Sequence, residues 1–341
     1  MRNPYVISVL ILAITLILSV AVGSVYIPPA TLFGLLADRL GIPLSTAWVQ
    51  SQATASVILF QLRLPRTVLV ALVGAALAGS GASYQGLFRN PLADPYLIGV
   101  ASGAGLGAVM VMALNWPSTF WGLAAVPAAA FIFGLASVAL VYWLASIGRT
   151  VPTTNLILAG VALSSFTTAI SSYLMFRSEG DLHRAVAWLM GGGTLSGWAP
   201  VWSALPYIAI GLGTLLTMGH ALNVLQFGDE QAQQLGLPVG TVRLIIITAA
   251  SLTTAAAVAF AGIIGFVGLV VPHVIRLIWG GDYKRLLPLS ILGGASMLLL
   301  ADLLARIVIN PEELPVGVIT ALVGAPFFLW VLRRTKAQSF W

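Results

Sequence analysis

FGDEQAQQLGLP, residues 227–238, is the one long polar interruption in the second half of an otherwise apolar chain. The Gly-Asp step at 228–229 offers an N-cap, Glu230 favours the positive first turn, and Gly236 with Pro238 ends the helix about two turns later. Because apolar stretches flank this short amphipathic helix on both sides, it must lie outside a bilayer, held by two membrane helices. We expect a soluble partner to push on it.

The composition places the chain in a membrane. It is 59% hydrophobic and 8% charged, with a mean hydropathy of +1.00, which leaves too little polar surface to cover a soluble globule. Apolar stretches of roughly 20 residues recur without the alternation typical of a β-barrel. The sequence therefore predicts an all-α polytopic membrane protein.

The net charge of +6 and the pI near 10 could suggest nucleic acid, but the basic residues are scattered between the apolar stretches. Membrane topology explains them better, and no nucleic-acid partner is expected. With no cysteine, the chain has neither disulfides nor thiol catalysis. Its three histidines, His183, His220 and His273, lie far apart, so we expect no metal site.

About ten membrane helices are expected, with both termini on one side. Residues 1–25 could be a signal peptide, but the later spans and Arg2 favour a retained first helix. Residues 26–61 are too polar to span and predict an external loop with a short surface helix. The other spans are expected at 67–83, 97–114, 121–145, 156–176, 202–218, 243–260, 265–279, 286–304 and 315–332.

A cytoplasmic N-terminus places most Lys and Arg residues on the cytoplasmic side, as the positive-inside rule requires. Both termini and the 228–238 helix are then cytoplasmic. Arg63, Arg66 and Arg306 are exceptions at the outer ends of two helices. They could attract the carboxylates of a docking protein, or they could be interfacial residues, with Arg306 paired to Asp302 four residues before it.

Two stretches on the predicted cytoplasmic side could form an inner gate. Asn90 and Leu92 belong to the turn NPLADP, and Thr153 with Thr154 opens the fifth helix. Ordinary turn formation and helix capping would also explain these residues. Arg177, at the outer end of the fifth helix, belongs to a solvated loop or borders an entrance where it could meet a carboxylate of a ligand.

Catalytic function is not indicated. The chain has no GxxxxGK[ST] phosphate-binding loop, no Ser/His/Asp arrangement and no paired carboxylates. An ion-coupled secondary transporter would explain ten helices, but it usually carries ionisable residues at mid-membrane, and Asp302, near a helix end, is the one acid within a span.

The chain resembles the FecCD-type permeases, the transmembrane subunits of type II ABC importers for ferric siderophores, haem and vitamin B12. The resemblance extends from about residue 60 to the C-terminus. It is carried by RLPR at 63–66, GASYQGLFRNPLADPYLIGVASGAG at 81–105, LAGVALS at 158–164, WLMGG at 188–192, GDEQAQQLGLP at 228–238, GFVGLVVPHVIR at 265–276, ADLLAR at 301–306 and ELPVGVITALVGAPFFLWVL at 313–332.

The resemblance implies a single permease domain over residues 1–341, with a generic first helix and outer loop over about 1–62 and the family core over about 63–335. Two permeases, identical or related, would surround a path along their common axis. Two copies of a separate ATPase, which binds ATP and Mg, would lie on the cytoplasmic face of a bacterial or archaeal inner membrane. A substrate-binding protein would dock outside.

The resemblance also implies roles for single residues. Those of the ATPase-coupling helix are Gly228, Asp229, Glu230, Gln231, Leu235 and Gly236. Those that pair with glutamates of the binding protein are Arg63, Arg66 and Arg306. Those of the cytoplasmic gate are Asn90, Leu92, Thr153 and Thr154. The expected cargo is an iron chelate, a ferric siderophore or haem, and vitamin B12 is the alternative, since WLMGG is similar to the B12 permeases.

Overall fold

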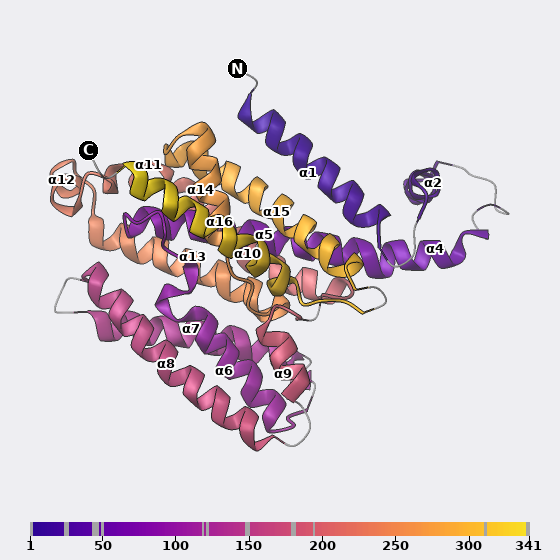
Figure 1. Ribbon diagram of the computed structural model, residues 1–341, viewed down its shortest axis with the longest axis horizontal. Helices are drawn as coiled ribbons and strands as arrows, with labels where there is room; N and C mark the ends of the chain where they lie inside the picture. The colour runs from indigo at the N-terminus through magenta and orange to yellow at the C-terminus, as the bar shows by residue number, and fades with distance from the viewer. Residues whose placement is uncertain are drawn as a thin grey trace.

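The computed structural model describes residues 3–23, 27–42, 48, 51–117, 119–120, 123–146, 151–178, 182–193, 195–309 and 312–338. Helices dominate these ranges (Figure 1). In the first half they are α1 (Pro4–Ala21), α2 (Pro29–Arg39), α4 (Ala53–Val57), the π-helix η1 (Ile58–Arg63), α5 (Leu64–Leu87), the 3-10 helix η2 (Pro95–Ile98), α6 (Val100–Ala113) and α7 (Ala125–Ala145). In the second half they are α8 (Thr153–Arg177), α9 (Leu182–Leu189), α10 (Trp198–Thr217), α11 (Gly219–Leu225), α12 (Asp229–Gln234), α13 (Val239–Ala261), α14 (Val267–Trp279), α15 (Tyr283–Ile307) and α16 (Val316–Gln338).

The expected number of membrane helices is confirmed for the described residues. Seven helical runs are long and apolar enough to cross a membrane: α1, the continuous run 53–87, α7, α8, α10, α13 and α15. The shorter apolar helices α6, α14 and α16 complete the set of ten. The chain is a multi-pass membrane protein.

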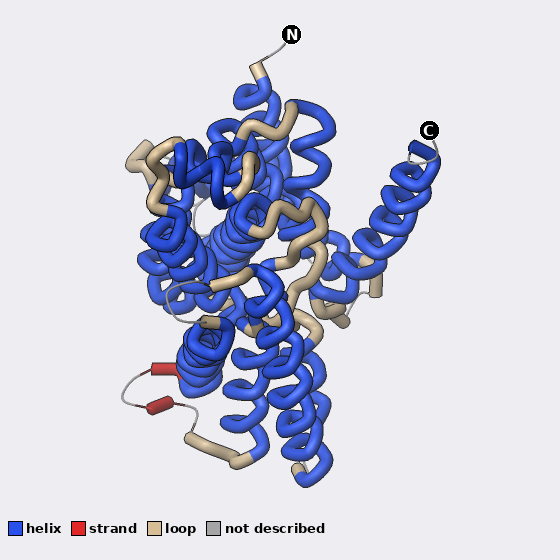
Figure 2. Tube along the Cα trace, turned by 90° about the vertical axis from the view of Figure 1, so that its left-hand side faces the viewer, coloured by secondary structure: helices blue, strands red, loops and turns tan. Residues whose placement is uncertain are grey.

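Two boundaries differ from the sequence-based expectation. The second membrane helix begins at Ala53 rather than at residue 67, because α4 and η1 continue into α5 without a break. The apolar run of residues 57–60 extends this helix and is not part of the expected outer loop. The span expected to begin at Trp121, which lies outside the described residues, becomes helical at Ala125, after a small antiparallel ribbon of β1 (Thr119–Phe120) and β2 (Leu123–Ala124) (Figure 2).

Helix α5 lies in the middle of the bundle, against α10, α13, α14 and α15 (Figure 1). In the most apolar window of α13, 72% of the residues are buried, whereas the same measure is 22% for α8, so α13 is an inner helix and α8 a peripheral one. The C-terminal part of α16 stands away from the other helices in Figure 2.

Glycines allow α5 to approach its neighbours backbone to backbone. A Cβ atom on Gly74 would overlap the carbonyl group of Gly294 in α15, and a Cβ on Gly81 would overlap that of Gly268 in α14. Small residues serve this purpose in membranes, where lipid is as apolar as a helix and association depends on close packing.

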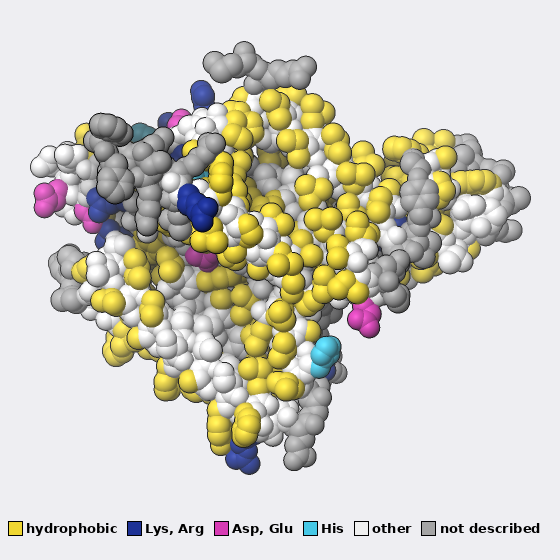
Figure 3. Space-filling view, in the orientation of Figure 1, with side chains coloured by type: hydrophobic (Ala, Val, Ile, Leu, Met, Phe, Trp, Pro, Cys, Tyr) yellow, Lys and Arg dark blue, Asp and Glu magenta, His cyan; other side chains and the backbone are white. Residues whose placement is uncertain are grey.

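The surface divides by chemistry along the long axis of the molecule. Hydrophobic side chains cover much of the middle of the face in Figure 3, while most of its acidic and basic side chains gather at the left end, around α12. This distribution is that of a protein whose middle faces lipid and whose α12 end faces water.

Because Gly74 meets backbone, Gly74→Ala should destabilise the fold by about 1–3 kcal/mol, the usual cost of overpacking a tight interface. Thermal unfolding in detergent measures the effect. The matched control is Gly213→Ala in α10, where an added Cβ meets nothing within 4 Å. Equal midpoints for the two variants would contradict this account of the α5–α15 contact.

Candidate functional site

The polar segment 227–238 forms the expected short helix. Helix α12 begins at Asp229 after Gly228, whose φ of 104° suits glycine, and it ends before Gly236, whose φ is 84°. Ala232 is completely buried and fastens the helix to the rest of the bundle. The sequence-based prediction of a closed helix between two spans, α10 and α13, is confirmed.

Asp229 turns toward its own chain. Its Oδ2 accepts a hydrogen bond of 2.8 Å from Nη2 of Arg243, and its Oδ1 lies 3.8 Å from Nη2 of Arg89. The side chain is 40% exposed. Asp229, one of the residues expected to contact an ATPase, is therefore paired with cations of its own chain.

The other residues of this segment face outward. Glu230, Gln231 and Gly236 are exposed, and Leu235 is 67% exposed. An exposed leucine beside exposed polar side chains is the composition of a protein-docking surface rather than of a lipid-facing one. Phe227, at 65% exposed, extends this surface.

The structure brings Arg63 and Arg306 together at the end of α1. Nη1 of Arg63 donates to the carbonyl oxygens of Val20 and Ala21, at 2.9 and 3.1 Å. Nη2 of Arg306 donates to the carbonyl and hydroxyl oxygens of Ser19, both at 3.1 Å. Two cations thus satisfy the last carbonyls of a helix that carries no basic residue in its own last turn.

Asp302 joins these arginines to Arg66. Its Oδ1 accepts from Nε and Nη2 of Arg66 at 3.0 and 2.9 Å, and Nε of Arg306 lies 3.0 Å from Oδ2. The pairing of Arg306 with Asp302, one of the two sequence-based alternatives, is present. Nη1 of Arg66 also donates to Oε2 of Glu313 at 2.7 Å. Arg63 and Arg306 are 7% exposed, and the side chain of Arg66 is 19% exposed.

The four residues assigned to a gate lie on two segments that follow α5 and open α8. Asn90 and Leu92 are exposed, and Oδ1 of Asn90 accepts the Leu92 amide at 2.9 Å. Thr153 and Thr154 form the first turn of α8 without a side-chain cap. Thr153 is half-buried and Thr154 is exposed.

Asp94, in the same turn as Asn90, caps η2. Its Oδ1 accepts the Tyr96 amide at 2.8 Å. Burial raises the pKa of this carboxyl to about 6, although the bond from Tyr96 acts in the opposite direction.

Helix α8 has an unburied polar stripe. Thr154, Ser165, Thr168 and Ser172 are all exposed, and their spacing of eleven, three and four residues places them on one face. Arg177 is exposed at the far end of the same helix and donates to the hydroxyl of Tyr173 at 3.3 Å. Between Thr154 and Ser165 the same face carries exposed Leu158 and Val161, so the hydroxyl groups gather from Ser165 to Ser172, toward the end that carries Arg177.

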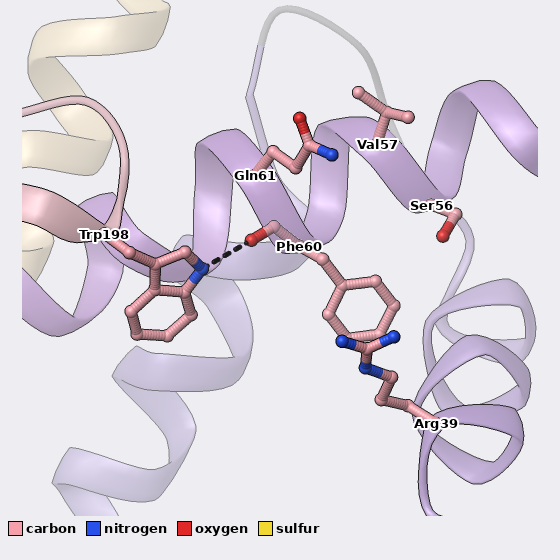
Figure 4. A pocket seen from close by; sticks show the side chains of 6 residues that line it. All are labelled: Arg39, Ser56, Val57, Phe60, Gln61 and Trp198. Atoms are coloured by element: carbon pink, nitrogen blue, oxygen red, sulfur yellow. Dashed lines mark hydrogen bonds between the residues drawn. The ribbon is translucent and has the colours of Figure 1, made fainter.

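A cavity of about 440 Å³ lies beside η1 (Figure 4). Nε1 of Trp198 donates to the Phe60 carbonyl at 3.0 Å, and the Arg39 guanidinium lies 5.7 Å from the centre of the Phe60 ring. The lining residues are Arg39, Ser56, Val57, Phe60, Gln61 and Trp198. Among the described residues, no group of three or more His, Asp and Glu could hold a metal ion.

Sequence reasoning missed Arg243 and Arg89. Arg243 is 7% exposed in α13, an inner helix, and a cation in that place requires an acidic or carbonyl partner. This requirement is the signal by which Arg243 could have been singled out from the sequence. Its partner Asp229 lies 14 residues earlier, outside any local helix spacing, so only the fold identifies it.

Residues 11–334 match the FecCD transport family. The chain belongs to the FecCD family. It is 42% identical over 331 residues to the ABC transporter permease protein YvrB of Bacillus subtilis, covering 97% of this chain and 93% of that one. It is 47% identical over 286 residues to the cobalamin import system permease protein BtuC of Halobacterium salinarum, covering 84% and 76%.

A solved structure of a metal-chelate type ABC transporter in an inward-facing conformation has the same fold. It superposes with a TM-score of 0.79 at 31% identity, over 96% of this FecCD chain and 97% of the other. The chain is thus an ABC importer permease of the FecCD family, a transport subunit rather than an enzyme.

Arg306→Gln should lower the thermal stability of this FecCD permease. The change uncovers the end of α1 and leaves buried Asp302 with Arg66 alone, and breaking a buried ion pair costs about 3–5 kcal/mol when no other partner remains. We expect a loss below that range because Arg66 stays. The control is Arg177→Gln, which removes an exposed cation. A similar unfolding midpoint for both variants in detergent would argue that the hydrogen bonds from Arg306 to the end of α1 do not stabilise the fold.

Asp94→Asn should stabilise the protein at pH 7.5. The folded pKa of about 6 exceeds the unfolded value of about 3.9, so ionised Asp94 carries a penalty above pH 6 that is relieved as pH falls through 6. The asparagine oxygen still accepts the Tyr96 amide. The gain in melting temperature should shrink at pH 5, with exposed Asp38→Asn as control. A gain independent of pH would contradict the assignment.

Proposed function

We propose that this chain forms, with a second copy of itself, the transmembrane path of an ATP-driven importer for a metal chelate of the cobalamin class. The observation that carries the proposal is 47% identity to a permease named for cobalamin import, together with a fold shared over almost the whole chain with a metal-chelate type transporter. Family membership favours this ATP-driven mechanism over ion-coupled secondary transport.

The polar stripe of α8 supports a second copy. In a single chain, Ser165, Thr168 and Ser172 are exposed along the span, and Ser165 donates to its own helix, to the carbonyl oxygen of Val161 at 3.0 Å. Their oxygens can still accept hydrogen bonds from water. Two copies that turn these stripes toward a common axis would line a water-filled path with small hydroxyl and apolar groups. Such a path suits a large chelate with both polar and apolar surface.

The α12 segment supports an ATPase partner. Glu230 and Gln231 are exposed on a short helix held at a fixed place between two membrane helices, and Leu235 is exposed at its C-cap. Two copies of an ATPase, which would bind ATP and Mg, would lie at this end in the cytoplasm of a bacterial or archaeal cell. Both termini would be cytoplasmic.

The other end would receive an extracytoplasmic binding protein. Arg63, Arg66 and Arg306 lie together there, and the described side chains of the cluster carry three positive charges against the two of Asp302 and Glu313. A partner with acidic residues fits this balance, and Arg66 is the most exposed of the three arginines.

A ferric chelate is the second candidate cargo. Exposed Arg177 at the outer end of α8 could pair with a carboxylate of haem or of a siderophore. Cobalamin offers no comparable free carboxylate, so the two cargoes differ in their expected dependence on this residue.

Proteoliposomes with this permease, its ATPase and its binding protein should take up cobalamin only with internal ATP. Glu230→Lys/Leu235→Glu should abolish uptake by blocking the ATPase contact, whereas exposed Gln234→Ala should not. Ferric haem uptake that falls with Arg177→Gln would replace the cobalamin assignment. Uptake driven by a proton or sodium gradient without ATP would refute the importer.

A further inference from the structure

Arg243 is held between two segments that the chain separates widely. Its Nη2 donates to Oδ2 of Asp229 at 2.8 Å, and its Nη1 donates to the carbonyl oxygen of Val151 at 2.8 Å. Asp229 is the first residue of α12, and Val151 lies two residues before α8. One guanidinium therefore connects the candidate ATPase-docking helix to the start of α8, the helix that carries the candidate gate residues Thr153 and Thr154.

The connection is stiff. The Arg243 side chain is 9% exposed, and Val151 packs against the main hydrophobic core. A guanidinium is planar, with its donors in a fixed fork, so two bonds from its two terminal nitrogens fix the relative position of their acceptors. Movement of Asp229 would then be passed to Val151 rather than absorbed by a flexible side chain.

A second branch leads from Asp229 to the other gate segment. Oδ1 of Asp229 lies 3.8 Å from Nη2 of Arg89, and a Cβ atom on Gly228 would lie 3.2 Å from Nη1 of the same arginine. Arg89 directly precedes Asn90 and has a left-handed backbone, with φ of 51°. The two oxygens of the Asp229 carboxylate thus face Arg243, which is bonded to Val151 just before α8, and Arg89, which directly precedes Asn90.

We propose that Asp229 and Arg243 form a relay that transmits the movement of α12 to the start of α8, with Arg89 as a weaker branch toward Asn90. This inference rests on the proposed function, because it assumes that an ATPase moves α12. It gives Asp229 a positioning role inside the permease instead of a contact with the ATPase. Arg243 likewise positions α8 and touches no cargo.

The absence of cysteine from the chain permits a direct test. Thr154→Cys places one thiol at the start of α8, and its modification by a membrane-impermeant maleimide is read on the permease band. In complex with the ATPase, trapping with ATP and vanadate should change the modification rate in an otherwise wild-type permease. Arg243→Gln should remove this nucleotide dependence. It should also reduce the cargo moved per ATP by about tenfold, a factor within the range typical of coupling between two sites.

Arg285→Gln is the matched control, since Arg285 is exposed at the same end of the bundle and its loss removes the same charge. It should keep the nucleotide dependence. Arg243→Lys covers the case in which Arg243→Gln does not assemble with the ATPase. Lysine retains the charge, but its single ammonium group cannot reproduce the planar two-nitrogen fork that joins Asp229 to Val151, so the dependence should also be lost.

Nucleotide-dependent modification that persists in either Arg243 variant would overturn the relay, and so would a Thr154→Cys thiol that never responds to nucleotide when Arg243 is present. Failure of the proposed cargo is distinguishable from both outcomes. In that case modification of the Thr154→Cys variant responds to nucleotide and depends on Arg243, while neither cobalamin nor ferric haem is taken up. That result would support the relay and refute the cargo assignment.

Discussion

The contact between the backbones of α5 and α15 at Gly74 and Gly294 is the constraint on which the rest of the structure depends. Lipid gives two apolar helices no hydrophobic reason to associate, so their packing needs an approach close enough for extensive dispersion contacts. Glycine at both positions permits that approach. Once α5 is fixed against α15, Arg66 near its start lies beside Asp302, and Arg89 just after its end lies beside α12. One tight helix pair thus positions the charged groups at both ends of the bundle.

The two ends use charge differently. Asp302 is completely buried between Arg66 and Arg306, and a buried carboxylate that loses its partners is strongly destabilising. This cluster is therefore a fixed support for the end of α1. Asp229 is 40% exposed, whereas the side chain of its partner Arg243 is 9% exposed. This pair therefore joins a partly solvated helix to the interior of the bundle, which is the property required of a part that transmits movement.

Much of the fold follows from the sequence, because ten apolar stretches leave few alternatives to membrane helices, and the glycines around 228–238 delimit α12. The helix start at Ala53 could not be predicted in this way. Residues 51–56 are polar enough to suggest a loop, whereas in the structure the helix that begins at Ala53 continues through η1 into α5. The partners of Arg63, Arg243 and Asp229 could not be predicted either. Arg243 and Asp229 lie on different helices, and local spacing rules act only within one.

The arrangement of Arg63, Arg66 and Arg306 decides which one an acidic partner could reach. Arg63 and Arg306 satisfy the last carbonyls of α1, so recruiting either would expose those groups and uncouple the helix end. Arg66 differs, because one of its two partners is Glu313, whose side chain is 49% exposed. A carboxylate from outside could replace that of Glu313 while Arg66 keeps both bonds to Asp302. Exchange of one carboxylate for another costs far less than uncovering buried carbonyls, and docking is therefore expected to involve Arg66.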